Sequence, residues 1–410
     1  MNSTESSLFW IVLCSVLAPL MAGLVPRKLV PEVVLLLVLG VLIGPNVLGW
    51  AITTDPIDLL SELGLGMLFL LAGYEIELGE LTGAGGRRAW WTWLACLLAA
   101  LVVVWLLGLS GVIHAEAAVA IALTSTALGT LLPILKDSGM LGTAVGGTVM
   151  HHGAFGELGP IMAMAVLLGA SGPGRSLVVL LLFGLAAAAV SVFAVLLRRE
   201  GSRLLAVIRA GAETTGQTVV RLTMLLLVTL GLLAVIVHLD VVLGAFAAGF
   251  ILRQLLPAGH ETLELRLNGL AFGFLIPIFF VTSGMAIDPA AVAGEPWTLV
   301  AFIALILLIR GGLVFLSERI SARRVTATRP SSLRESVAVA TYAATGLPII
   351  VAVTASAVSA GQMTTTNASV LVAGGAITVL LCPLTATLLL GHEPDAEGVA
   401  APVAVHPPPD

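Results

Sequence analysis

Apolar stretches of about 20 residues, each long enough to cross a bilayer as an α-helix, recur along most of the chain. Short segments that carry most of the charges separate them, together with clusters of proline, glycine and serine. Cutting the chain at these breaks predicts thirteen membrane-spanning helices. They cover residues 8–25, 30–50, 58–78, 89–112, 115–135, 143–169, 175–197, 217–237, 240–255, 267–286, 297–317, 334–358 and 367–390. The pattern therefore predicts an all-α polytopic membrane protein.

Two of these spans share an internal interruption. The fifth contains "ALTSTALGTLLPIL" and the twelfth "TYAATGLPIIVAV", so each has threonine, then glycine, then Leu-Pro-Ile near its middle. We expect both helices to be discontinuous, although an ordinary packing kink is the alternative. The residues expected at the breaks are Thr126, Gly129 and Pro133 in one helix, and Thr345, Gly346 and Pro348 in the other.

The positions of these two spans predict an inverted repeat. They are seven apart in order, and an odd offset means that they enter the membrane from opposite sides. The same offset pairs spans four to six with spans eleven to thirteen. Secondary transporters bind their substrate where two such broken helices cross.

Composition strengthens the membrane assignment and excludes several other classes. Hydrophobic residues make up 58% of the chain and charged residues only 10%, with a mean hydropathy of +1.09, which leaves no room for a separate soluble domain. A net charge of −5 argues against a nucleic-acid partner. Cys14, Cys96 and Cys382 are scattered through apolar segments, as expected of buried small side chains. No cofactor is indicated, and no constellation of catalytic residues indicates an enzyme.

Basic residues predict the orientation. Seventeen of the 19 Lys and Arg residues fall in alternate loops or at the adjoining helix ends, and Arg175 and Arg310 are the exceptions. By the positive-inside rule that side is cytoplasmic, so the N-terminus is expected outside and the C-terminus inside. Residues 391–410 are Pro-rich and are expected to form a disordered cytoplasmic tail. Glu75 and Glu77 are interpreted as a structural pair on the cytoplasmic side.

Glu157 and Arg310 carry charges near the middle of predicted spans. Each costs roughly 2.5–3.5 kcal/mol on insertion scales, so each needs a reason. Glu157 lies in "GAFGELGPI", where small residues leave space for other backbone or for an ion, and where Pro160 frees a backbone carbonyl. A structural ion pair or hydrogen bond is the alternative to an ion site. Arg310 suits a structural counter-charge as well as a role in transport.

A single buried carboxylate can couple two ions, because it cannot hold H⁺ and a metal cation together. Partial desolvation favours the protonated form of Glu157, so that protons and cations can compete for it near neutral pH. The other oxygen ligands are expected from Ser125, Thr126, Thr345 and the unwound backbone. His151 and His152 are expected either to relay or sense protons or to make structural hydrogen bonds.

Four segments resemble the bacterial monovalent cation:proton antiporters, the sodium/proton exchanger family. They are "LLVLGVLIGPNVLG" (36–49), "LGLGMLFLLAGYEIEL" (63–78), "LGAFAAGFIL" (243–252) and "FGFLIPIFFVTSGMAID" (272–288). The resemblance implies homodimers in the bacterial plasma membrane, each with a transmembrane exchanger domain over residues 1–390. It also implies elevator-like movement of a core, about residues 89–169 and 267–390, against dimerisation helices among the rest.

The resemblance also implies functional roles. The family's helix-six motif of two polar residues, the second acidic, corresponds to Gly156-Glu157, and Arg310 falls where the family has Lys or Arg. We therefore expect exchange of Na⁺ or K⁺ for H⁺, in support of pH homeostasis. Because Gly156 leaves one carboxylate at the motif, we expect the exchange to be electroneutral. A sodium-coupled organic-anion symporter of the same fold is the alternative, and a channel or membrane sensor is a third hypothesis.

Overall fold

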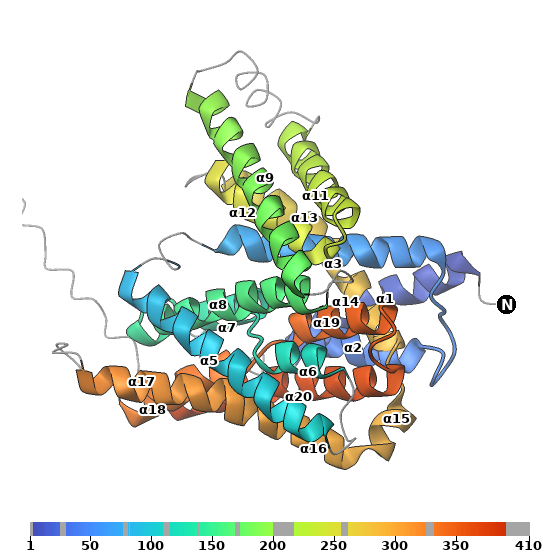
Figure 1. Ribbon diagram of the computed structural model, residues 1–410. Coiled ribbons are helices and arrows are strands. Elements are labelled where there is room, and N and C mark those ends of the chain that lie inside the picture. Colours follow the sequence, from blue (N-terminus) through green and yellow to red (C-terminus); the bar gives the residue numbers. More distant parts are fainter. Residues whose placement is uncertain are drawn as a thin grey trace, which may run out of the picture.

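The computed structural model describes residues 3–24, 30–76, 81, 83–109, 115–137, 139–168, 173–199, 217–255, 261–324 and 332–390. Throughout this part of the chain the regular secondary structure is helical (Figure 1). The helices in the first half of the chain are α1 (Thr4–Leu24), α2 (Glu32–Ile43), α3 (Asp55–Glu75), α5 (Gly83–Gly108), α6 (Glu116–Leu123), α7 (Leu128–Asp137), α8 (Ala144–Leu167) and α9 (Pro173–Arg199). Those that follow are α11 (Thr218–Ile236), α12 (Val241–Leu255), α13 (Glu261–Leu270), η2 (Ala271–Leu275), α14 (Ile276–Met285), α15 (Pro289–Gly294), α16 (Pro296–Leu305), η3 (Ile306–Gly311), α17 (Gly312–Arg324), α18 (Leu333–Ala343), α19 (Leu347–Ser359) and α20 (Thr365–Leu390).

These helices match the thirteen predicted spans. Within the described residues, eight helical stretches are long and apolar enough to cross a membrane, and four shorter helical stretches are also apolar. Together with α8, which carries Glu157, they account for every predicted span. The all-α polytopic fold is confirmed, whereas the tail at 391–410 lies outside the described residues. Two π-helical turns, η2 and η3, were not predicted.

The fifth and twelfth spans are both broken. In the first, α6 ends at Leu123 and α7 begins at Leu128, so the break includes Thr126. Gly129 and Pro133, which were expected in the break, instead lie within α7. Pro133 removes one amide donor, which a helix can tolerate when its other bonds remain. In the second span, Thr345 and Gly346 lie between α18 and α19, and Pro348 is in the first turn of α19.

The helices pack in two groups. One group contains α2, α3, α12 and α14, with α1, α11 and α13 against them. The other contains α5 to α8 and α16 to α20, of which α17, α18 and α20 lie at the bottom of the view in Figure 1. The sequence placed residues 267–286 with the core. In the structure the end of this segment, α14, packs instead against α2 and α3 of the first group.

Glycines allow the helices of the first group to touch backbone to backbone. A Cβ at Gly249 in α12 would overlap the carbonyl of Leu70 in α3, and one at Gly284 in α14 would overlap the carbonyl of Leu37 in α2. Small residues at such crossings let membrane helices approach closely enough for dispersion forces to hold them. This group is therefore held mainly by packing.

Among the described residues, hydrogen bonds at two positions, one after α14 and one before α12, join the groups. Ser356 in α19 donates to Oδ2 of Asp240, at 2.8 Å, just before α12 begins. The amide of Asp288, after α14, donates to Oγ of Ser369 in α20 at 3.1 Å. Both bonds must break if one group is to slide past the other.

Candidate functional site

The two helix breaks lie against each other and complete each other's backbone hydrogen bonds. The amide of Ala127 donates to the carbonyl of Thr345 at 2.7 Å. The Oγ of Ser125 donates to the carbonyl of Gly346 at 3.4 Å. A Cβ at position 346 would overlap that hydroxyl, so glycine is required for this close approach. Polar backbone that would be costly in lipid is thus satisfied inside the protein.

Helix α8 contributes a third backbone contact to the crossing. Pro160 has no amide hydrogen, so the carbonyl of Gly156, one turn earlier, lacks its helical donor. The amide of Thr126 donates to this carbonyl at 2.8 Å. The sequence predicts that the carbonyl of Gly156 lacks a helical donor, and in the structure it accepts a hydrogen bond from the backbone of the first break.

Glu157 lies beside the crossing and is almost fully buried, with 3% of its surface exposed. The amide of Leu128, the first residue of α7, donates to its Oε2 at 3.4 Å. The N-terminus of a helix carries partial positive charge and unpaired amide donors, so it favours a carboxylate or another anion.

A second carboxylate, from α3, lies near Glu157. Glu75 is close enough to interact with it electrostatically, and a Cβ at Gly129 in α7 would lie 4.0 Å from Oε2 of Glu75. Glu75 is expected from the sequence to form a structural pair with Glu77 on the cytoplasmic side, but Glu77 lies outside the described residues, so that pair stays a prediction. Residues 66–74 are buried on every face of α3. The signal available in the sequence was the unbroken run of apolar and small residues over the same positions, which leads directly to Glu75.

Arg310 lies in the π-helical turn η3 and is fully buried, with 0% of its surface exposed. Its Nε donates to Oγ1 of Thr126 at 3.0 Å, and its Nη2 donates to the carbonyl of His152 at 2.7 Å. The Sγ of Cys96 lies 4.0 Å from its Nη1. Within the described residues these acceptors are all neutral. A single wider turn of this kind often marks a functional site, because it redirects a side chain.

The guanidinium of Arg310 explains the glycine before Glu157. A Cβ at Gly156 would overlap Nη2 of Arg310 and the side chain of Thr126. The space that a larger residue would need at this position is therefore filled by an arginine from another helix.

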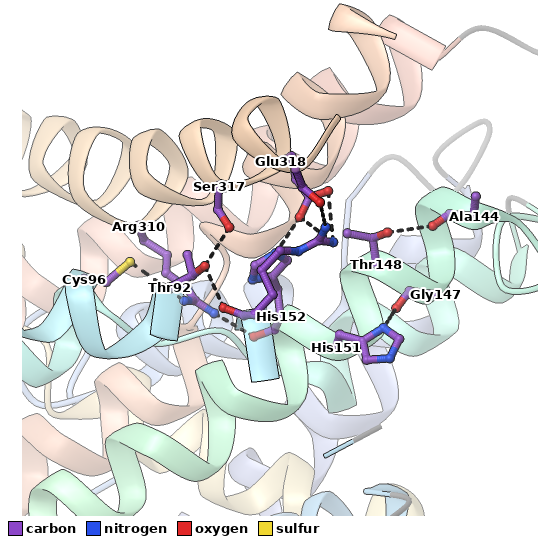
Figure 2. A network of polar contacts seen from close by, with 12 residues as sticks. Thr92, Cys96, Ala144, Gly147, Thr148, His151, His152, Arg310, Ser317 and Glu318 are labelled. Atoms are coloured by element: carbon purple, nitrogen blue, oxygen red, sulfur yellow. Dashed lines mark hydrogen bonds and ion pairs between the residues drawn. The ribbon is translucent and has the colours of Figure 1, made fainter. Parts of the chain in front are cut away.

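His151 and His152 point in different directions, as Figure 2 shows. The Nδ1 of His151 lies 2.6 Å from the carbonyl of Gly147 in the same helix. His152 is 1% exposed, and its Nε2 lies 2.9 Å from Oε1 of Glu318 in α17. In the described structure the hydrogen bonds of both rings are therefore to groups other than Glu157.

Glu318 is the centre of a polar cluster that the sequence analysis did not identify (Figure 2). Nη2 of Arg88, in α5, lies 2.9 Å from Oε1 of Glu318 and 3.2 Å from Oε2. Arg88 also donates to Ser321 through Nη1. The available signal was spacing, because Glu318 follows Arg310 by about two helical turns and so shares its face.

The hydroxyl groups expected to bind a cation are at the crossing, and each donates to a backbone carbonyl. Ser125 donates to Ala122 at 2.8 Å, Thr126 to Ala343 and Thr345 to Tyr342 at 2.7 Å. A hydroxyl that donates keeps its lone pairs as acceptors; on Thr126 one of them accepts from Nε of Arg310. Hydroxyl oxygens of this kind suit hard cations. The arrangement can therefore present oxygen atoms to a cation beside a buried carboxylate.

The chain resembles known proteins over most of its length. Residues 12–391 match the family described as "Sodium/hydrogen exchanger, transmembrane". The putative Na⁺/H⁺ antiporter YjbQ of Bacillus subtilis is 25% identical over 70% of this chain, which spans 48% of that relative. The Na⁺/H⁺-K⁺ antiporter GerN of Bacillus cereus is 23% identical, over 68% of this chain and 71% of its own length. The chain thus spans about half of one of these relatives.

A solved structure has the same fold. The sodium proton antiporter MjNhaP1 from Methanocaldococcus jannaschii at pH 8 aligns with a TM-score of 0.61 and 18% identity. The alignment covers 94% of this chain and 98% of the other. These matches give no support to the organic-anion symporter hypothesis.

Proposed function

The chain belongs to the sodium/hydrogen exchanger family, and on that basis we propose that it exchanges Na⁺ or K⁺ for H⁺ across a membrane. The observation that carries this proposal is the buried Glu157, which faces the N-terminus of α7 where two broken helices cross. A carboxylate in this place can bind a proton or a cation in turn. The competition between the two couples their movements.

In this proposal the cation is held by oxygen atoms around Glu157. Ser125, Thr126 and Thr345 supply hydroxyl oxygens, and the unwound backbone supplies carbonyls. Arg310 acts as a fixed counter-charge, because a guanidinium stays protonated and cannot carry protons through the cycle.

Exchange requires the site to open to each side of the membrane in turn. We propose that the group containing α5 to α8 and α16 to α20 moves as an elevator against the other group, within a homodimer. The packing of the described helices into two groups supports this movement. We further propose that the N-terminus is outside and the C-terminus is cytoplasmic, as the basic residues predict.

The experiment that tests the function is cation-driven proton flux in proteoliposomes, measured separately with Na⁺, K⁺ and an organic cation. We expect Na⁺ or K⁺ to drive protons and Glu157→Gln to abolish the flux, because the amide cannot bind either ion by charge. Glu264→Gln is the matched control, since it makes the same change in α13, in the other helix group. Equal flux from wild type and Glu157→Gln would refute the assigned role.

The elevator movement has its own test. Cysteines in place of Asp240 and Ser356 replace the hydrogen bond between the groups with a disulfide under oxidising conditions. We expect the oxidised protein to stop exchanging and the reduced protein to recover. Full activity of the oxidised, cross-linked protein would contradict a movement between α12 and α19.

Orientation is tested by labelling the two ends of one broken helix. Cysteines at the exposed positions Arg334, at the start of α18, and Gln362, after α19, should react with impermeant reagents from the cytoplasm and from outside, respectively. The reverse pattern would invert the proposed topology.

A further inference from the structure

An unbroken series of contacts links the cluster around Glu318 to the helix crossing, and Figure 2 shows Glu318, His152 and Arg310 within it. Arg88 pairs with Glu318, and Glu318 contacts the ring of His152. The carbonyl of His152 then accepts from Arg310, and Arg310 donates to Thr126 in the first break. The series joins α5, α17, α8 and η3 to the unwound backbone.

We propose that Glu318 is a positioning residue for the exchange site, and that it acts through His152 and Arg310. The inference rests on the proposed function, since the site it positions is the one around Glu157. Arg88 also holds the carboxylate of Glu318, since its Nη2 contacts both Oε1 and Oε2. No role for Arg88 or Glu318 follows from the sequence motifs alone.

The charges in the cluster determine whether the ring of His152 is protonated. The charged groups that face this ring are Glu318 from α17, Arg88 from α5 and Arg310 from η3. A protonated ring would add a third positive charge against one carboxylate, in a place where water cannot solvate it. The ring is therefore neutral and donates its Nε2 hydrogen to Glu318.

In this proposal the ring of His152 positions other groups and does not relay protons. With the hydrogen on Nε2, the buried Nδ1 has no hydrogen, and in the described structure it has no hydrogen-bond partner. The ring serves as a fixed donor that holds α8 against α17. In this way Glu318 sets the place of the His152 carbonyl, which receives Arg310.

The effect reaches Glu157 through the first break. Arg310 holds the side chain of Thr126, whose amide also bonds the carbonyl of Gly156. Two residues farther along the chain, the amide of Leu128 faces Glu157. A displaced Arg310 therefore loosens the backbone that aims the N-terminus of α7 at the carboxylate.

The test compares Glu318→Gln with Glu264→Gln. Both changes convert a carboxylate beside an arginine into an amide, and Glu264 contacts Tyr74 and Arg253 in the other helix group. We measure amide hydrogen exchange at residues 124–128 and 344–346 in the purified protein. Glu318→Gln should speed this exchange about tenfold, as expected when a buried hydrogen-bond network loses one partner, and Glu264→Gln should leave it unchanged.

Transport supplies the second measurement. In Glu318→Gln the KM for Na⁺ or K⁺ should rise about tenfold while the maximal rate changes less than about twofold. The neutral variant His152→Gln keeps a donor at the place of Nε2, so it should retain the wild-type pH profile. A changed pH profile in His152→Gln would show that the ring titrates and would overturn the positioning role.

The remaining outcomes are separable. If Glu318→Gln does not fold, the double variant Arg88→Gln/Glu318→Gln removes the unpaired charge and allows the same two measurements. Unchanged hydrogen exchange at both breaks in a folded variant would overturn the inference. Wild-type protein that exchanges no cation for protons would refute the proposed function, whereas the hydrogen-exchange result would still decide whether Glu318 holds the crossing.

Discussion

Two helix crossings in this molecule bring backbone against backbone, but they do so for different purposes. Where α3 meets α12, Gly249 lies on the carbonyl of Leu70, and both helices are continuous. Where the broken spans meet, the amide of Ala127 bonds the carbonyl of Thr345, and both helices are interrupted. At the first crossing each helix satisfies its own backbone, whereas at the second, amides and carbonyls face each other and Glu157.

The difference teaches how a membrane protein can build rigidity and a polar site with the same small residues. A continuous helix satisfies its own backbone, so glycine at its surface contributes only close packing. A broken helix has to find partners elsewhere, and those partners fix the geometry of the site. We therefore expect substitutions at the first crossing to affect stability and those at the second to affect exchange.

The largest expected effect is on folding, from Gly249→Ala. The new methyl would meet backbone atoms of Leu70 and Tyr74, which cannot rotate away. We expect a loss of about 1–3 kcal/mol, as for other overpacked sites, seen as a lower thermal midpoint of the purified protein. An unchanged midpoint would mean that this crossing is looser than the structure shows.

Gly156→Ala should give the opposite result. Its methyl would meet the end of the flexible Arg310 side chain, which can shift, and Cβ and Oγ1 of Thr126, which can move only with the unwound backbone of the first break. We expect a smaller change in thermal midpoint than in Gly249→Ala, together with a clear loss of cation-driven proton flux. If both variants lose stability equally and Gly156→Ala keeps its flux, the distinction between the crossings is wrong.

Arg310→Lys should have a moderate effect on exchange. Lysine keeps the charge but cannot donate to Thr126, His152 and Cys96 in three directions as the guanidinium does. We expect the pH profile of exchange to move to higher pH, since a more distant cation stabilises the Glu157 carboxylate less, with a smaller change in maximal rate. An unchanged pH profile would show that the charge of Arg310 does not influence the titration of Glu157.

The smallest expected effect is that of membrane potential. If Glu157 alone swaps one proton for one monovalent cation, no net charge moves, and clamping the potential should leave the flux unchanged. Glu75 is a second carboxylate near the site, so the same measurement can test whether it also binds protons during exchange. A flux that responds to potential in wild type, and no longer responds in Glu75→Gln, would show that both carboxylates titrate.

Much of the fold could be predicted from the sequence, because apolar stretches of bilayer length are a local property. The thirteen spans and the two broken helices follow from runs of hydrophobic residues and from repeated Thr, Gly and Pro. The residues at the breaks were less predictable. Unwinding at Thr126 and helix at Gly129 depend on partners such as Gly156 and Thr345, which lie on other helices.

The candidate site was predictable only in its charged centre. Glu157 and Arg310 stand out because a charge in an apolar span is rare, and their roles stay predictions. Glu75, Arg88 and Glu318 lie near helix ends, where charges are ordinary, so they do not stand out in the sequence as Glu157 and Arg310 do. Only the packing of α3, α5 and α17 brings them near the crossing.

The partnership between the two breaks also has a consequence for how the protein is made. Thr126 bonds the carbonyl of a residue that is 217 positions later in the chain. At synthesis rates of about 5–20 residues per second, that partner follows roughly ten to forty seconds afterwards. During this interval the amide of Ala127 lacks its partner, the carbonyl of Thr345 in the twelfth span, and lipid offers none. Until the twelfth span is made, this part of the first break therefore needs a hydrogen-bond partner from water or from the insertion machinery, and it can be buried in the bilayer only afterwards.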